Sequence, residues 1–258
     1  MPSEEIIIRT YLCIWLVILG AVMGSFVECA VSRWKVGEPM FIDRSRCLSC
    51  EHILSVLDLI PIFSWLFLRG RCRYCGERIP ADCLMTELAG AAGFLMLGIS
   101  VPLRELGQWL IWAVLLLALS LTDIAKRVIP NELLLCLAAN RIAWFFVQRE
   151  EFEAVFEALK SIFVPITLLA LVLLAERLMS REVMGGGDIK LLFVFSLYFT
   201  WIQQLLTLLL ACLAGLAFAI PAGRKRGASV PFGPFLSVGA LLTICFGNPV
   251  IEWYFSLF

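Results

Sequence analysis

Residues 6–31 read IIIRTYLCIWLVILGAVMGSFVECAV and are broken only by Arg9, Thr10 and Glu28. A helix of about 20 apolar residues is long enough to cross the hydrocarbon core of a bilayer. Two glutamates precede the run, where a signal peptide would carry positive charge, and the run is too long for the apolar region of a signal peptide. We therefore expect a retained first membrane span.

Seven further apolar runs follow, at residues 84–101, 108–122, 132–148, 160–178, 189–201, 204–221 and 230–247. Only Gln203 and Gln204 separate the sixth run of the chain from the seventh. Hydrophobic residues make up 61% of the 258 residues and charged residues 16%, too few charges to cover a soluble domain. The net charge of zero excludes a general attraction for nucleic acid. The sequence predicts an all-α polytopic membrane protein with about eight transmembrane helices.

The polar residues 33–83 lie between the first two spans and hold eight Lys or Arg, six Asp or Glu and five Cys. We expect three parts in the chain: a first transmembrane segment at 1–32, a folded loop at 33–83 and a membrane core of about seven helices at 84–258. In the eight-span arrangement, sixteen Lys and Arg fall on the side of this loop, four fall on the other side and Arg141 falls within a span. Positive loops face the cytoplasm, so we expect the large loop there and both termini outside.

Four cysteines of the loop form two CxxC pairs, Cys47 with Cys50 and Cys72 with Cys75. Each pair can offer two thiolates from a single turn, and two pairs complete a tetrahedron around zinc. Gly76 after the second pair suits a tight turn, and a cytoplasmic loop is reduced, which disfavours disulfides. We therefore predict a zinc-ribbon-like loop with a structural Zn²⁺, with redox dithiols or free thiols as the alternatives.

Two aspartates are predicted at the cytoplasmic membrane face. Asp123 ends the third apolar run, and Asp188 opens the sixth after Gly185, Gly186 and Gly187. An ionisable residue in a span costs about 2.5–3.5 kcal/mol, so it is a functional candidate by default. Two carboxylates held close together share a proton, and the charged one activates water while the protonated one donates to a scissile carbonyl. The glycines would let a substrate backbone approach a flexible active-site loop. Asp188 as an ordinary helix N-cap is the alternative.

Several motifs in chain order resemble those of the type IV prepilin peptidases, the leader peptidase/N-methyltransferases of type IV pilus and type II secretion systems, which are GxGD aspartic proteases of the peptidase A24 family. They are Gly24-Ser25-Phe26 followed by Arg33, the stretch from Asp58 to Cys72 flanked by the CxxC pairs, Glu87, Asp123 with Ile129-Pro130-Asn131, Gly185-Gly186-Gly187-Asp188, and Pro231-Phe232-Gly233-Pro234. Glu28 departs from the family, which commonly has Asn at this position.

The resemblance implies a multi-pass protein of the bacterial inner membrane that works among membrane lipids on prepilins or pseudopilins. Asp123 and Asp188 would cleave the basic leader at the cytoplasmic face, so that residues 84–258 form an aspartic protease core. The new N-terminal residue would then be methylated from S-adenosyl-L-methionine. Candidate residues for the methyl donor or the substrate are Glu28, Arg33, Asp58 and Glu87.

Two other functions are compatible with parts of the pattern. One is a different GxGD intramembrane aspartic protease without methyltransferase activity, although the tetracysteine loop argues against it. The other is a non-enzymatic, zinc-binding membrane scaffold or a transporter, in which Asp123 and Asp188 would couple to protons. A transporter would place its carboxylates near the midplane and show internal repeats, and no repeat is visible in the sequence.

Overall fold

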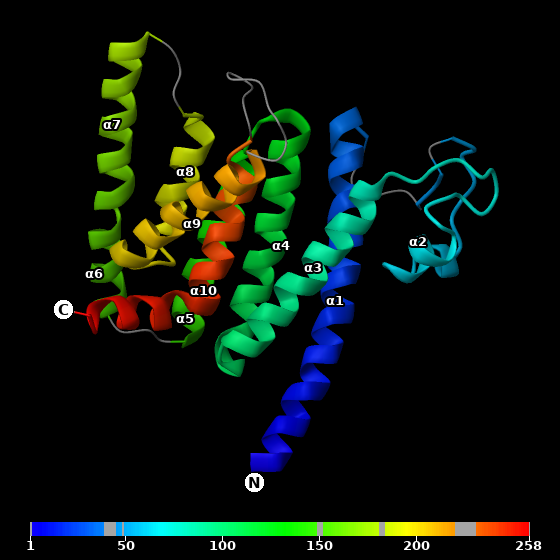
Figure 1. The fold of residues 1–258 in the computed structure, drawn as a ribbon, viewed down its shortest axis with the longest axis horizontal. Coiled ribbons are helices and arrows are strands. Elements are labelled where there is room, and N and C mark those ends of the chain that lie inside the picture. The colour runs from blue at the N-terminus through cyan, green and yellow to red at the C-terminus, as the bar shows by residue number, and fades with distance from the viewer. Residues whose placement is uncertain are drawn as a thin grey trace. The chain divides into compact units, whose positions relative to one another are not determined.

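The computed structural model describes residues 2–38, 45–47, 49–148, 152–180, 184–219 and 231–257, and these are nearly all helical (Figure 1). The chain divides into two compact units, Met1–Leu121 and Thr122–Phe258. Among the sixteen basic residues expected on the side of the large loop, five lie outside the described residues: Arg44, Arg181, Arg224, Lys225 and Arg226. Arg149, expected on the other side, also lies outside them. The predicted all-α class is confirmed.

Six helical segments of the described chain are long and apolar enough to cross a membrane. They lie in α1 (Pro2–Val36), α3 (Ala81–Ser100), α4 (Leu103–Lys126), the pair α6 (Phe152–Ser161) and α7 (Phe163–Met179), α9 (Trp201–Ala219) and α10 (Gly233–Phe255). The other two predicted runs form α5 (Asn131–Gln148) and α8 (Gly186–Phe195). Helix α8 has only 10 residues, half of what a span needs. Helix α5 has 18 residues but carries Asn140 and Arg141 near its middle.

In the first unit, α1 packs along α3 at a contact made by glycines (Figure 1). A Cβ added to Gly90 of α3 would overlap the carbonyl oxygen of Gly20 in α1, and one added to Gly20 would overlap Gly90 in return. One turn further along α1, a Cβ on Gly24 would lie 2.5 Å from the Thr86 carbonyl oxygen. Small residues allow helix backbones to approach this closely inside a membrane. This contact fixes the two helices that carry the cysteine loop between them.

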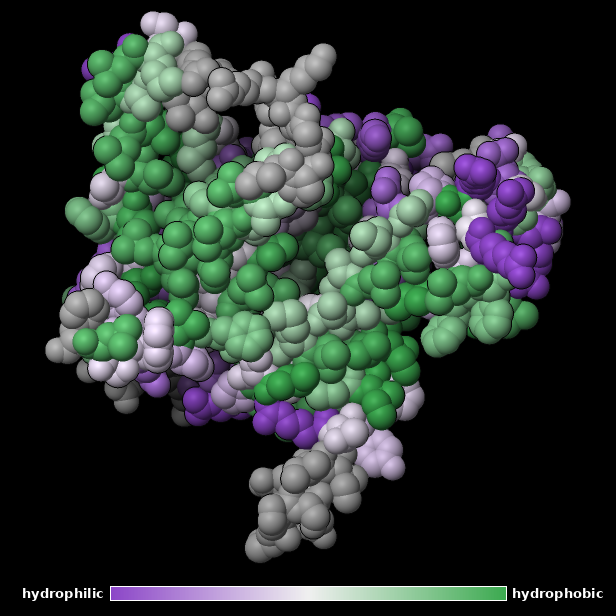
Figure 2. Space-filling model, in the orientation of Figure 1, coloured by the Kyte–Doolittle hydropathy of each residue, from purple (hydrophilic) through white to green (hydrophobic). Residues whose placement is uncertain are grey.

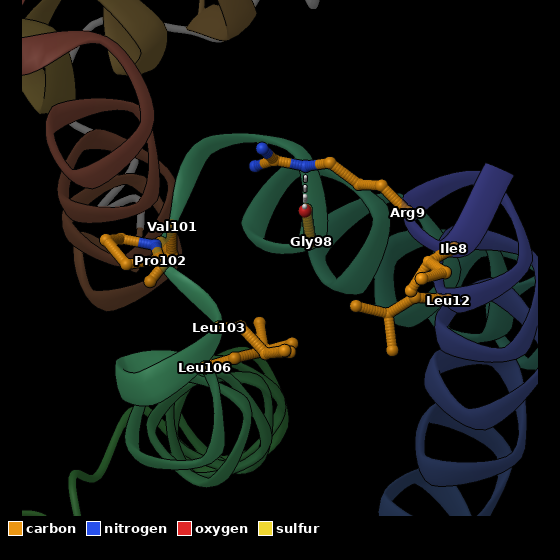
Figure 3. A pocket seen from close by; sticks show the side chains of 8 residues that line it. All are labelled: Ile8, Arg9, Leu12, Gly98, Val101, Pro102, Leu103 and Leu106. Atoms are coloured by element: carbon orange, nitrogen blue, oxygen red, sulfur yellow. Dashed lines mark hydrogen bonds between the residues drawn. The ribbon is translucent and has the colours of Figure 1, made fainter. Parts of the chain in front are cut away.

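Arg9 is the cation that interrupts the first apolar run, and the structure shows what it binds. Its guanidinium donates to the carbonyl oxygens of Gly98, at 3.4 Å, and Ile99, which belong to the last turn of α3 (Figure 3). Helix C-termini leave such carbonyls without partners and attract cations. Beside the guanidinium lies a cavity of about 190 Å³ with a largely apolar lining that includes Leu12, Val101 and Leu106.

In the second unit, Pro165 explains why α6 and α7 are separate helices. Proline has no N–H and cannot donate to the carbonyl four residues earlier, which is that of Ser161. The helix accordingly breaks at Ile162. Helix α10 packs on α9, where a Cβ on Gly239 would lie 2.6 Å from the Thr207 carbonyl oxygen.

Buried polar side chains join the helices of the second unit. Gln204 is fully buried and donates to the Leu192 carbonyl at 2.6 Å, so it ties α9 to α8. Helix α9 begins at Trp201, so Gln203 and Gln204 lie in its first turn. The break between the sixth and seventh apolar runs therefore falls before Trp201 and not at these two glutamines. Arg141, predicted within a span, donates to the Leu197 carbonyl at 2.9 Å.

We predict that Gly90→Ala lowers the melting temperature of the detergent-solubilised protein, because the new Cβ overlaps the α1 backbone and overpacking costs about 1–3 kcal/mol. Gly215→Ala is the matched control, since a Cβ there meets only the ring of Phe235 at 3.7 Å. Equal melting temperatures for the two variants would contradict the close α1–α3 contact.

Candidate functional site

The four cysteines of the two CxxC pairs come together in the loop. The sulfur atoms of Cys47, Cys50, Cys72 and Cys75 all lie within 4.8 Å of one another. The Cys47 and Cys75 sulfurs are 3.8 Å apart. Four thiolates around a metal with metal–sulfur bonds of about 2.3 Å, the length found for zinc, are separated by about 3.8 Å, whereas a disulfide is about 2.0 Å long. The cluster could therefore hold a tetrahedral metal ion.

The two CxxC turns have the same backbone geometry. In each turn the residue four positions after the first cysteine donates its N–H to the carbonyl of that cysteine, Glu51 to Cys47 at 2.9 Å and Gly76 to Cys72 at 3.0 Å. Both residues have positive φ, 57° at Glu51 and 75° at Gly76. The tight turn predicted at Gly76 is confirmed. The equivalent turn after the first CxxC pair has Glu51 at this position, so no glycine indicates that turn in the sequence.

Hydrogen bonds favour the metal-binding form of one thiol in the cluster, and ring stacking positions the only histidine of the chain. Backbone N–H groups of Cys50 and Ser49 lower the pKa of the Cys47 thiol to about 7. A thiolate is the form in which cysteine binds metal. The ring of His52 stacks on that of Tyr74, with centroids 3.7 Å apart. His52 thus packs beside the cluster, and four sulfurs already complete a tetrahedron without it.

Asp58 is a structural part of this loop. Its carboxylate accepts hydrogen bonds from the Ser55 hydroxyl at 2.7 Å and the Tyr74 hydroxyl at 3.0 Å, and it pairs with Arg73 at 2.8 Å. Burial raises the pKa of Asp58, but the hydrogen bonds from Ser55 and Tyr74 and the charge of Arg73 outweigh burial and hold this pKa below its usual range. The side chain is only 4% exposed, so Asp58 ties the segment before α2 to the second CxxC turn.

Asp123 lies in the last turn of α4 and is 6% exposed. Its Oδ2 accepts a hydrogen bond from the backbone N–H of Gly233 at 2.9 Å, the residue that begins α10. A helix N-terminus presents free N–H groups and favours negative charge nearby. A Cβ on Gly233 would lie 2.8 Å from the same oxygen, so only glycine fits this contact without displacement. The segment Pro231–Pro234 therefore supplies a backbone hydrogen-bond donor to the Asp123 carboxylate.

Asp188 is half-buried in the first turn of α8, and its charge interacts with that of Asp123. Among the residues that the structure describes, none donates a hydrogen bond to the Asp188 carboxylate. The two predicted aspartates are thus close enough for their charges to interact, and Asp123 has a backbone donor whereas Asp188 has none among the described residues. Such a pair can supply a general base and a general acid to one bound water.

The three glycines before Asp188, predicted to form a flexible active-site loop, lie at the start of α8. Gly186 and Gly187 already belong to α8, and Gly185 precedes it with an ordinary φ of −65°. A Cβ on Gly187 would lie 3.0 Å from the Cβ of Ile129, while one on Gly186 would meet nothing within 4 Å. Gly187 therefore permits a close approach between α8 and the turn after α4. Lys190 reinforces it by donating to Asn131 at 3.1 Å.

The remaining candidates lie in the first unit. Glu28 in α1 accepts a hydrogen bond from Thr86 at 3.3 Å, and Glu87, one residue further along α3, is 7% exposed. The charges of both glutamates act on the thiol of Cys83. Arg33 lies in the last turn of α1. The structure therefore groups Glu28 with Glu87 at the α1–α3 contact, whereas Asp58 is held within the loop.

Two known families match consecutive parts of the chain. Residues 18–101 match the bacterial peptidase A24 N-terminal domain, and residues 110–220 match the type IV leader peptidase family.

Curated relatives match over most of their length and carry the name prepilin leader peptidase/N-methyltransferase. The protein of Aeromonas hydrophila is 30% identical over 86% of this chain and 79% of its own. The protein of Dichelobacter nodosus is 32% identical over 82% of this chain and 74% of its own. The protein of Bacillus subtilis strain 168 is 29% identical over 94% of this chain and 97% of its own. No solved structure matches the chain. With two matched family domains and relatives of this similarity, the chain belongs to the type IV leader peptidase family, peptidase A24.

Proposed function

We propose that the protein is a prepilin leader peptidase that also methylates the N-terminus it creates. The observation that carries this proposal is the pairing of Asp123 with Asp188 in a chain of this family. Pairing of this kind suits hydrolysis without a nucleophilic side chain. A different GxGD protease or a scaffold is disfavoured, because the proteins of Aeromonas hydrophila, Bacillus subtilis and Dichelobacter nodosus, which match most of the chain, are each named as both peptidase and methyltransferase.

In the proposed cleavage, Asp123 is the ionised member, because the Gly233 N–H stabilises its negative charge. Asp188, without a described donor, holds the proton. Water attacks the scissile carbonyl carbon as Asp123 takes one of its protons, and Asp188 gives its own proton to the carbonyl oxygen. The C–N bond then breaks as the proton on Asp123 passes to the leaving amine, which becomes the new N-terminus. One hydroxyl of the tetrahedral intermediate returns its proton to Asp188 as the carboxyl group of the leader forms.

Methylation would transfer the methyl group of S-adenosyl-L-methionine from its sulfonium to this amine, which loses a proton. Glu28 and Glu87 are the carboxylates that the structure groups together, and carboxylates suit a cationic donor or an ammonium acceptor. Arg33, at the end of the same α1, stays a candidate for a carboxylate of either ligand. Asp58 is engaged by Arg73 and Tyr74, so we assign it to the loop rather than to a ligand.

A structural zinc ion in the cluster of Cys47, Cys50, Cys72 and Cys75 completes the proposal. The ion would supply folding energy to a loop that has little core of its own. The chain is a multi-pass membrane protein, and we place it in the bacterial inner membrane with the loop in the cytoplasm and both termini outside. The scissile bond of a prepilin or pseudopilin, at the start of its apolar segment, would then meet the aspartates at the cytoplasmic interface.

The most direct test of this function is to incubate the purified protein with a prepilin, with and without S-adenosyl-L-methionine, and to measure intact masses. We expect loss of the leader in both samples and a further gain of one methyl group only with the donor. Cleavage without methylation would reduce the function to a peptidase, and an unchanged substrate would overturn it.

We predict that Asp123→Asn and Asp188→Asn each lower kcat for leader cleavage by roughly 10²- to 10⁴-fold, because an amide cannot cycle a proton. The double variant should be no worse than the worse single one, since the carboxylates act as a unit. Glu132→Gln, an exposed carboxylate of α5, is the matched control and should cleave normally. Robust cleavage by either Asn variant would remove the aspartyl mechanism.

Elemental analysis should find about one zinc per chain, because four thiolates fill one tetrahedron. Cys47→Ser or Cys72→Ser should lower the zinc content and speed proteolysis between Arg33 and Cys83. Cys136→Ser, on an exposed position of α5, should do neither. Intact protein with unmodified thiols and no metal would refute the zinc site.

Exposed carboxylates of the loop are expected to bind the basic leader before the reaction begins. Neutralising Glu51, Glu77 and Asp82 together should raise KM more than it lowers kcat, and the effect should shrink at high salt. Asp58 is left out because its charge is already paired, and Asp43 lies outside the described residues. A salt-independent loss confined to kcat would assign these residues to catalytic geometry instead.

A further inference from the structure

The loop between α1 and α3 exposes large apolar side chains to an extent that a water-facing loop would not. Five of them form what we term the apolar patch: Val56 and Leu57 are 78% and 62% exposed, and Phe63, Leu66 and Phe67 are 60%, 55% and 83% exposed. Val56 and Leu57 belong to the short helix η1 (Val56–Leu59), which contacts α2 (Phe63–Phe67). Figure 2 shows green apolar atoms beside purple charged ones on this part of the molecule.

The local fold turns these residues outward. Phe63, Leu66 and Phe67 are three and four positions apart, which places them on one face of α2. Trp65 points elsewhere, because a Cβ on Gly70 would lie 2.8 Å from its ring. Gly70 has a φ of 66°, so the chain turns back sharply there and covers Trp65. The tryptophan forms the inside of this small fold, and the apolar patch forms its outside.

A hydrogen bond fixes the depth of the patch relative to the membrane. The backbone N–H of Ile62, immediately before α2, donates to the Glu87 carboxylate at 2.6 Å. Glu87 lies six residues inside α3, which is about 9 Å along a helix that is itself about 30 Å long. Since α3 is a candidate span, Ile62 is held no more than about 9 Å inside one end of that span, within the depth of about 5–10 Å that interfacial helices reach.

The attachment at Ile62 is a constrained one. Ile62 has a φ of 66°, a region that β-branched residues rarely adopt. Glu87, whose carboxylate accepts this N–H, is only 7% exposed. The hydrogen bond therefore replaces the water molecules that the Ile62 N–H and the Glu87 carboxylate lose on burial. The fold thus accepts an unfavourable backbone conformation in order to hold α2 beside α3.

Positive charge lies next to the apolar patch. Arg69, Arg71 and Arg78 are exposed, and no carboxylate among the described residues lies within ion-pair distance of them, whereas Arg73 is paired with Asp58. A bilayer surface with anionic lipid has an apolar layer of acyl chains beneath a layer of negatively charged headgroups. The apolar patch matches the first layer and the neighbouring arginines match the second.

We propose that the apolar patch is a membrane-interface foot, with its side chains inserted among the lipids of the leaflet at the N-terminal end of α3 and with Arg69, Arg71 and Arg78 at the lipid phosphates. A second copy of the chain or a hydrophobic substrate segment would account for the apolar surface, but not for its fixed depth beside a span together with unpaired cations. The proposal requires only that α3 spans the membrane, and it holds whether or not the protein is a leader peptidase.

Site-specific photo-crosslinking in lipid nanodiscs of phosphatidylethanolamine and phosphatidylglycerol tests the foot. The photoreactive analogue of phenylalanine, p-benzoylphenylalanine, is placed at Phe67 or Phe63, and at Ile53, an exposed position of the same loop outside the patch, as the control. We expect lipid adducts, read by intact mass, to be at least about five-fold more frequent at the two Phe positions. Equal yields, or crosslinks at Phe67 to a second chain alone, would overturn the proposal. Retained zinc or unchanged melting temperature verifies folding.

Charge and insertion can be separated with two further variants. Phe67→Asp should lift the foot, so that trypsin cuts after Arg69 at least about five-fold faster in nanodiscs, whereas Ile53→Asp, at an exposed position outside the patch, should not change this rate. Replacing Arg69, Arg71 and Arg78 by Gln should increase cutting after Arg73 in phosphatidylglycerol nanodiscs and leave it unchanged in phosphatidylcholine. An unchanged cutting rate for Phe67→Asp, together with an arginine variant that is cut at the same rate as the unchanged protein in both lipids, would contradict a foot that binds the membrane surface.

Discussion

A polar group inside an apolar helix has to find its partner within the protein, because lipid offers none. Arg9 meets this requirement with carbonyls at the end of α3, Arg141 with the Leu197 carbonyl and Gln204 with the Leu192 carbonyl. Asp188 differs from these three residues, since no described residue donates a hydrogen bond to its carboxylate. The neighbouring Asp123 receives a single backbone N–H, from Gly233. Groups left unsatisfied in this way are available to a water and a substrate, and that is where we locate the chemistry.

Hydropathy and short spacings predicted the all-α class, most of the spans, the cysteine cluster and the places of Asp123 and Asp188 at helix ends, because these features depend on local sequence. Contacts between distant segments could not be predicted. The donor to Asp123 lies 110 residues away in the sequence, and only a resemblance pointed to its motif. The close approach of Gly187 to Ile129 is another such contact, because the glycine run before Asp188 does not indicate which segment it packs against. Apolar composition alone also could not separate α8, with 10 residues, from a full span.

The large loop is held by attachments of different kinds that act together. Two matching CxxC turns bring four sulfurs to tetrahedral spacing, and Asp58 ties the second turn to the segment before α2. Glu87 then fastens that segment to α3 through Ile62. Because α3 in turn packs against α1 through Gly20 and Gly90, the loop has a defined orientation relative to these two helices. A metal in the cluster would stabilise a small fold whose position is already set by the helices.

The sharing of one proton between Asp123 and Asp188 is the central claim, and the pH dependence of kcat/KM for leader cleavage tests it most directly. A pair that needs one carboxylate ionised and the other protonated gives a bell-shaped profile with two apparent pKa values that belong to the pair. The measurement is made on the purified protein in nanodiscs from about pH 4 to pH 9, with a prepilin whose leader keeps its charge over that range. We expect a bell. A profile that rises to a plateau through one ionisation, or one that is flat, would show that the two aspartates do not work as a proton-sharing pair.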